Sequence, residues 1–124
     1  MLTYSPTAYY RAYRAWHLSP FHLALFQVLQ ERGVPLGKIQ GSQGFQAGYT
    51  VRPLAERQAE DELMWLIQVG VLRREVDGQG ITDSYRLAPL GRQILESVSS
   101  ASQDQKRGSF QDWITDRLTR WGLT

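Results

Sequence analysis

The change of hydrophobic period at Gly70 is the feature that most constrains the fold. Before this glycine, apolar residues recur at helical spacing, which predicts a helix over residues 53–69. After it, apolar and polar residues alternate, which predicts strands over 71–76 and 83–88. The predicted turn at 77–80 begins with Asp-Gly, a strong β-hairpin signal. The chain therefore has to join a helix to an antiparallel hairpin through a single glycine.

Two Ser-Pro pairs, at 5–6 and at 19–20, have the residue types that begin helices. The first predicts a helix over 5–17. The second predicts a helix that ends at Gly33, a candidate C-cap. Apolar spacing predicts a further helix over 89–98.

Residues 34–51 contain four glycines that interrupt any long helix. We expect a loop there, apart from a single turn around 36–40, and the sequence leaves open whether 41–50 is ordered. The aromatic and arginine residues that alternate over 9–17 have two interpretations. An aromatic face packed on the core is favoured over a surface that stacks on nucleic-acid bases.

The C-terminal part of the sequence predicts a polar linker over 99–108 and an amphipathic helix over 109–124. The helix has a narrow apolar stripe, which is the candidate partner interface: Phe110, Trp113, Ile114, Leu118 and Trp121. This stripe either docks on the core of its own chain or forms a homodimer, and both alternatives stay open. Its two acidic residues make binding to a membrane surface the least favoured alternative.

Composition excludes several classes of site. The chain has no cysteine, and its two histidines, His17 and His22, do not have zinc-ligand spacing. We therefore expect no metal, no cofactor and no enzymatic activity. No apolar run is long enough to cross a bilayer and no signal peptide is recognisable, so the expected location is the cytoplasm. A net charge of +2 permits nucleic-acid binding without implying it.

The order of predicted elements resembles a winged helix-turn-helix domain over residues 19–98. A helix ending in Leu-x-x-x-Gly-Val-Leu, then a glycine-containing hairpin and a final helix, is typical of such domains. The resemblance implies an α+β fold, mostly helical, with a two- or three-stranded wing hairpin. Flanking helices are expected at 1–18 and 109–124. The stretch VGVLRREVDGQGITDSYRLAPLGRQ also resembles a small uncharacterised cyanobacterial family.

The winged-helix resemblance implies a DNA-binding protein of the transcriptional-regulator type, which would contact phosphates through its wing. The candidate residues are five arginines on the wing and around the start of the third helix: Arg52, Arg57, Arg73, Arg74 and Arg86. The alternative is intramolecular pairing. In that case Arg73 or Arg86 pairs with Glu75 or Asp83, and Arg57 pairs with Asp61.

The third helix has the wrong charge for reading DNA. Glu56, Glu60, Asp61 and Glu62 outnumber Arg57, whereas a helix in the major groove lies between phosphates. Its sign favours a protein-interaction module that keeps the winged-helix fold and offers the first three carboxylates to a basic partner. The frequency of DNA binding among winged-helix domains favours a DNA-binding function, which we therefore rank slightly ahead of the protein-interaction module.

Overall fold

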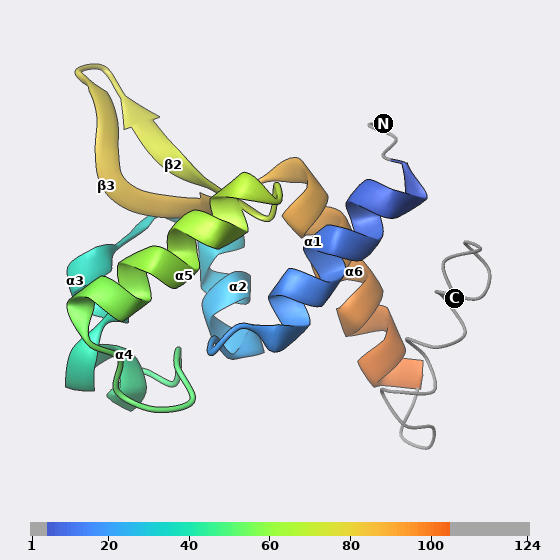
Figure 1. Cartoon of the computed structure of the whole chain (residues 1–124), viewed down its shortest axis with the longest axis horizontal. Helices are drawn as coiled ribbons and strands as arrows, with labels where there is room; N and C mark the ends of the chain where they lie inside the picture. Colours follow the sequence, from blue (N-terminus) through green and yellow to red (C-terminus); the bar gives the residue numbers. More distant parts are fainter. Residues whose placement is uncertain (1–4, 105–124) are drawn as a thin grey trace.

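In the computed structural model, residues 5–104 are described, with side chains described for 5–100 (Figure 1). This part of the chain is α+β, as expected, and contains six helices and one antiparallel three-stranded sheet. The elements in chain order are α1 (Pro6–Leu18), α2 (Leu23–Glu31), β1 (Val34–Pro35), α3 (Leu36–Ile39), α4 (Gly41–Gln46), α5 (Glu56–Gln68), β2 (Leu72–Asp77), β3 (Gly80–Leu87) and α6 (Pro89–Asp104).

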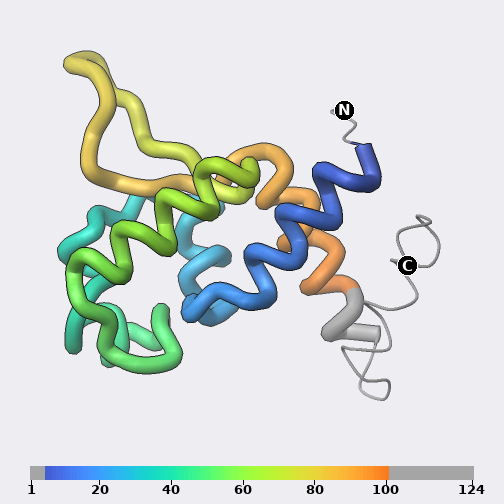
Figure 2. The backbone as a smooth tube through the Cα atoms, viewed as in Figure 1, coloured from blue at the N-terminus to red at the C-terminus, as the bar shows by residue number. Residues whose placement is uncertain are grey.

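The predicted hairpin is formed by β2 and β3, and it projects beyond the helices (Figure 2). Asp77 and Gly80 are register partners, so only two residues make the turn. The Asp77 carboxylate accepts a hydrogen bond from the backbone of Gln79 at 2.7 Å, which stabilises this turn. The short strand β1 pairs with the outer edge of β3, giving the order β1-β3-β2.

The glycine between α5 and β2 works as predicted. Gly70 has φ +92°, and its N–H donates to the carbonyl of Ile67 at 3.0 Å, while Val71 N–H donates to Leu66 at 2.9 Å. These two bonds form a Schellman motif, which requires the left-handed conformation that glycine adopts without strain. The helix begins three residues later than Pro53, because Leu54 is buried and its carbonyl accepts a bond from Gly41 at 2.7 Å.

The two Ser-Pro pairs have different outcomes. Ser5 accepts a hydrogen bond from Ala8 N–H at 3.1 Å and caps α1 as predicted. The second pair does not begin α2, which starts only at Leu23. Residues 20–22 are held extended instead, because Phe21 forms a β-bridge with Thr50 and the flanking backbone groups are bonded across the same two segments.

The prediction of a loop over 34–51 is largely wrong. The turn at 36–40 is present as α3, but β1 and α4 were not expected. Gln40 separates the two short helices, and Gly41, with φ +65°, is the first residue of α4. Gly44 serves a different purpose, because a Cβ at this position would overlap the carbonyl oxygen of Ile39. Glycine therefore allows α3 and α4 to pack closely here.

Residues 99–104 are helical, although the sequence predicted a linker over 99–108. No glycine or proline occurs between Gly91 and Gly108, and serine and alanine are compatible with a helix, so α6 continues to Asp104. The rest of the predicted linker and the predicted helix over 109–124, with its candidate interface, lie outside the described residues.

The core lies where α1, α5 and α6 surround α2 and the base of the sheet (Figure 1). Trp16 of α1 stacks on Phe26 of α2 with ring centroids 3.8 Å apart. Tyr13 and Trp16 are buried and Arg11 and Arg14 are exposed, which confirms the packed aromatic face. Tyr85 and Leu87 of β3 are also buried, so the hairpin is anchored at its base and exposed at its turn.

Candidate binding surface on α5 and the hairpin

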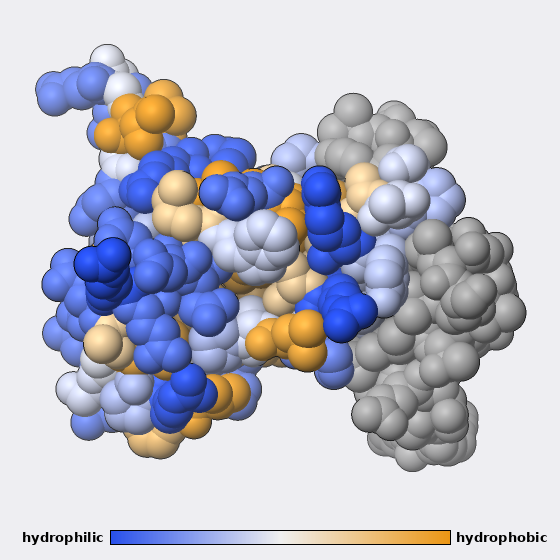
Figure 3. Space-filling model, viewed as in Figure 1, coloured by the Kyte–Doolittle hydropathy of each residue, from blue (hydrophilic) through white to orange (hydrophobic). Residues whose placement is uncertain are grey.

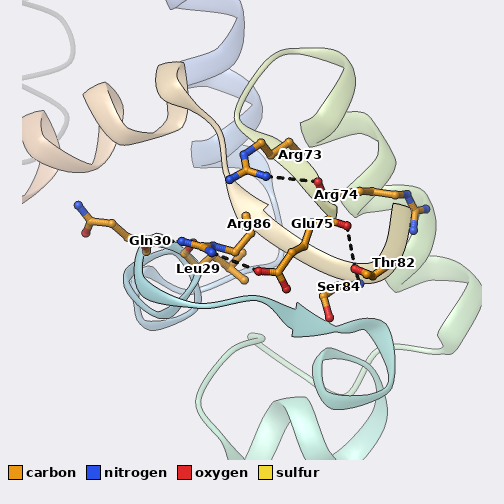
Figure 4. A network of polar contacts seen from close by, with 8 residues as sticks. All are labelled: Leu29, Gln30, Arg73, Arg74, Glu75, Thr82, Ser84 and Arg86. Carbon is orange, nitrogen blue, oxygen red and sulfur yellow. Dashed lines mark hydrogen bonds and ion pairs between the residues drawn. The ribbon is translucent and has the colours of Figure 1, made fainter. Parts of the chain in front are cut away.

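The five candidate arginines have different environments. Arg86 is the most constrained, because its guanidinium contacts three acceptors at once (Figure 4). It donates to the carbonyls of Leu29 and Gln30 at 3.2 Å each and pairs with the Glu75 carboxylate at 3.2 Å. The predicted alternative, in which a wing arginine pairs with Glu75, is therefore confirmed for Arg86. This side chain is occupied within the fold.

The end of α2 and the hairpin are adapted to this contact. Helix C-termini carry unpaired carbonyls and a partial negative charge, which the Arg86 cation satisfies. Gly33 follows α2 and was predicted as its C-cap, but it is not among the glycines with positive φ. A Cβ at Gly33 would instead overlap the Glu75 carboxylate. The glycine thus makes room for the ion pair that helps to close the helix.

Arg74 lies on the opposite face of the hairpin and connects it to α5. Its guanidinium lies 5.0 Å from the centroid of its register partner Tyr85, and it donates to the sulfur of Met64 at 3.6 Å. Burial raises the pKa of Tyr85 above its ordinary value of 10.0, with Glu60 acting in the same direction and Arg74 against it. Arg74 is half-buried, so most of its role is within the fold.

Arg52, Arg57 and Arg73 are the exposed members of the set. Arg73 points away from Arg74, as strand alternation predicts (Figure 4), and makes only a 3.4 Å bond to the Arg74 carbonyl. Among side chains of residues 5–100, no ion pair involves Arg57, so its predicted pair with Asp61 is not formed. Arg57 lies in the first turn of α5, whereas Arg73 lies on β2, which follows the other end of the helix. The structure does not bring these cations together.

The exposed side of α5 is acidic with apolar residues beside the acids. Glu56, Glu60 and Asp61 are exposed, as is Met64 with 37% of its surface accessible. The space-filling view is mostly hydrophilic over this part of the molecule and shows an apolar cluster near the hairpin tip (Figure 3). The cluster was not expected from the sequence.

Val76 and Ile81 form this cluster as register partners, with 63% and 74% of their surfaces exposed. The register shifts between Arg74 and Val76, and in the view of Figure 3 the apolar cluster is visible on the same side of the molecule as α5 in Figure 1. The signal in the sequence is that both residues immediately flank the turn, beyond the reach of the core. We call Glu56, Glu60, Asp61, Met64, Val76 and Ile81 together the acidic-apolar face.

Two classes of feature are absent from the described part of the chain. No group of three or more His, Asp or Glu side chains there is arranged to hold a metal ion. None of its helices has the length and apolar character needed to cross a membrane.

Comparison with known proteins gives one match. The family model described as Npun_F0494-like matches residues 2–120, so the resemblance that the sequence carries over 69–93 extends across nearly the whole chain. No curated protein and no solved structure matches it.

Proposed function

The chain belongs to the Npun_F0494-like family, and we propose that it is a winged-helix binding module that docks a basic, partly apolar protein segment on its acidic-apolar face. The element order supports the winged-helix part of this proposal. A helix, a short strand, two compact helical turns, a longer helix and a hairpin follow one another from α2 to β3, and β1 adds to the hairpin on the side of β3. In this arrangement α5 occupies the recognition position and β2–β3 the wing.

The charge of α5 is the observation that carries the proposed partner. Glu56, Glu60 and Asp61 are exposed along the helix, against the single cation of Arg57. A helix that enters the major groove lies between two rows of phosphates, so each uncompensated carboxylate opposes binding. The same carboxylates attract lysine and arginine side chains of a protein partner and speed its association.

The apolar members of the face define the rest of the partner. Met64 follows Glu60 by one helical turn and exposes apolar surface beside the carboxylates, and Val76 and Ile81 expose more toward the tip of the hairpin. Apolar anchors surrounded by polar groups are typical of protein interfaces, in which the anchors supply most of the affinity. An amphipathic basic segment fits this combination better than a uniformly charged polymer does.

Duplex DNA is the second candidate, on the basis of Arg52, Arg57 and Arg73. All three are exposed, and none forms an ion pair with a described side chain. Such arginines can contact phosphates without reading bases.

Fluorescence anisotropy with two labelled probes distinguishes the candidates. One probe is an amphipathic helical peptide made of Lys and Leu, and the other is a generic DNA duplex. Each is titrated with the whole chain at about 50 mM and about 200 mM salt. We expect the peptide to bind in the micromolar range and the duplex to show no binding at either salt concentration.

Matched variants test which surface is used. Replacing Glu60 and Asp61 by Gln and Asn should weaken peptide binding about tenfold. Replacing Glu31 and Glu96, exposed carboxylates elsewhere, by Gln should have little effect. If both double variants lose the same affinity for the peptide, the peptide is bound by general charge attraction, and the proposed face is refuted. Salt-sensitive duplex binding that is lost in Arg57→Ala/Arg73→Ala would establish the DNA candidate instead.

A further inference from the structure

A groove of about 360 Å³ runs between α1 and α5, apart from the acidic-apolar face. Its lining is mostly apolar, with charged side chains at its rims. The lining residues that matter are Tyr10, Arg11, Arg14 and Leu18 on α1 and Glu62 and Trp65 on α5. Helices α1 and α5 are the two neighbouring helices drawn in blue and green in Figure 1.

Two large apolar side chains in this groove are unusually exposed. Leu18 exposes 68% of its surface and Trp65 exposes 47%, although both lie beside the packed core. Arg14 is held at the rim by a 3.1 Å bond to the Tyr10 hydroxyl. An apolar floor with fixed polar rims is typical of a surface that receives an amphipathic helix.

We propose that residues 109–121 of the same chain occupy this groove. The sequence predicts an amphipathic helix there, with an apolar stripe that needs a partner surface. Twelve residues of helix, from Phe110 to Trp121, span about 17 Å, which matches the roughly 20 Å length of α1.

The segment follows a helix that packs on α1, and α1 lines one side of the groove. The hydroxyls of Tyr9 on α1 and Ser97 on α6 lie 3.1 Å apart, and α6 ends seven residues later at Asp104, about 10 Å further along its axis. Residues 105–108 span up to about 14 Å when extended, which exceeds the diameter of α1 with its side chains, about 10 Å.

The charges at the edges of the segment favour one orientation in the groove. At helical spacing, Arg120 lies at one edge of the apolar stripe with Asp116 beyond it, and Arg117 falls within the stripe beside Trp113. The other edge is neutral at Gln111 and Thr115. The α5 rim is acidic at Glu62, and the α1 rim is basic. Docking with the Arg120 edge toward α5 places Arg120 on the side of Glu62, and leaves the neutral edge beside the α1 arginines.

The chain contains no cysteine, so a single introduced cysteine is the only position that a thiol-reactive label modifies. A nitroxide is attached to Gln68→Cys in the full chain, and NMR signals are compared before and after its reduction. Gln68 is exposed on α5, three residues after Trp65, and does not line the groove, so the label should disturb neither the fold nor the docking. Amide signals of 110–121 are expected to lose most of their intensity. A nitroxide on Gln79→Cys, at the hairpin turn, should leave them unchanged. Undiminished signals in the Gln68→Cys sample would overturn the proposal.

A mixed sample distinguishes docking of the segment on its own chain from docking on a second copy of the chain. Isotope-labelled chains without nitroxide are mixed with unlabelled chains that carry it at position 68. Intramolecular docking predicts no signal loss over 110–121 in this mixture. Signal loss there would mean that the groove receives the segment of another chain, and would overturn the intramolecular assignment.

A charge exchange tests the orientation. In hydrogen exchange, Arg120→Glu should lower the protection of amides 110–121 about tenfold, and Arg107→Glu, in the predicted linker, should not. Adding Glu62→Arg to Arg120→Glu should restore protection, because the pair of opposite charges is re-formed. If protection is the same in all four proteins, the Arg120 edge does not face α5 and the proposed docking is wrong.

Discussion

Arg86→Ala tests whether the most constrained wing arginine holds the fold together. The substitution removes two charged hydrogen bonds to the last carbonyls of α2 and the ion pair with Glu75. Hydrogen bonds from a charged donor contribute about 1.5 kcal/mol each at the lower end of their range. The ion pair is worth less, because 19% and 35% of the two side chains are exposed. We therefore expect a loss of about 3 kcal/mol in the free energy of unfolding.

Arg73→Ala is the matched control, because Arg73 is the register partner of Arg86 on the neighbouring strand. Its side chain is exposed and makes only a long bond to a backbone carbonyl. A change within about 0.5 kcal/mol is expected. Arg86→Lys should retain little of the lost stability, since an ammonium group cannot reach three acceptors as a planar guanidinium does.

Urea unfolding followed by far-UV circular dichroism measures all three variants against the original chain. For a chain of this size, Arg86→Ala should also lower the melting temperature by roughly 10 °C. The reasoning is refuted if Arg86→Ala costs less than about 1 kcal/mol, or if Arg73→Ala costs as much as Arg86→Ala does. Either result would mean that the contacts of Arg86 do not stabilise the folded chain beyond what water offers in the unfolded one.

Two further predictions concern packing and pH. Gly44→Ala should destabilise the chain by about 2 kcal/mol, because the added Cβ overlaps the Ile39 carbonyl, whereas Gly37→Ala, with no atom within 4 Å of its Cβ, should stabilise it by about 0.5 kcal/mol in urea unfolding. Stability should fall as the pH rises above 10.0, because burial raises the pKa of Tyr85 and the unfolded chain loses this proton first. Tyr85→Phe should remove that part of the decrease when urea midpoints are compared across the alkaline range, and an unchanged slope would contradict it.

The sequence predicts the parts of the fold whose signals are local. Ser5 caps α1 through its own third neighbour, and Gly70 closes α5 through bonds within one turn. The hairpin follows from a two-residue turn. The start of α2 fails for the opposite reason, because Phe21 is held by Thr50, far along the chain. No property of Ser19-Pro20 reveals that pairing.

Glycine was misread for a related reason. The conformational freedom of glycine and its lack of a side chain are different properties, and a glycine-rich sequence indicates only the first. At Gly44 the missing Cβ allows two short helices to meet, and at Gly33 it leaves space for the Glu75 carboxylate. Both spaces depend on a residue brought in by the tertiary fold. A glycine-rich stretch therefore predicts a loop only where nothing packs against it.

The same distinction decides how the candidate arginines should be interpreted. In the sequence, Arg73, Arg74 and Arg86 are three cations of one hairpin, for which phosphate contact and pairing within the chain both stay open. In the structure, Arg86 closes α2 and Arg74 covers Tyr85, so two of the three stabilise the hairpin against the helices. The carboxylates of α5 are not neutralised in this way: among the described side chains, Glu56, Glu60 and Asp61 form no ion pair. In the folded chain, basic side chains of the hairpin are therefore engaged by other groups of the protein, whereas acidic side chains of α5 stay exposed. This difference is the basis for proposing a basic partner, although the sequence as a whole carries a positive net charge.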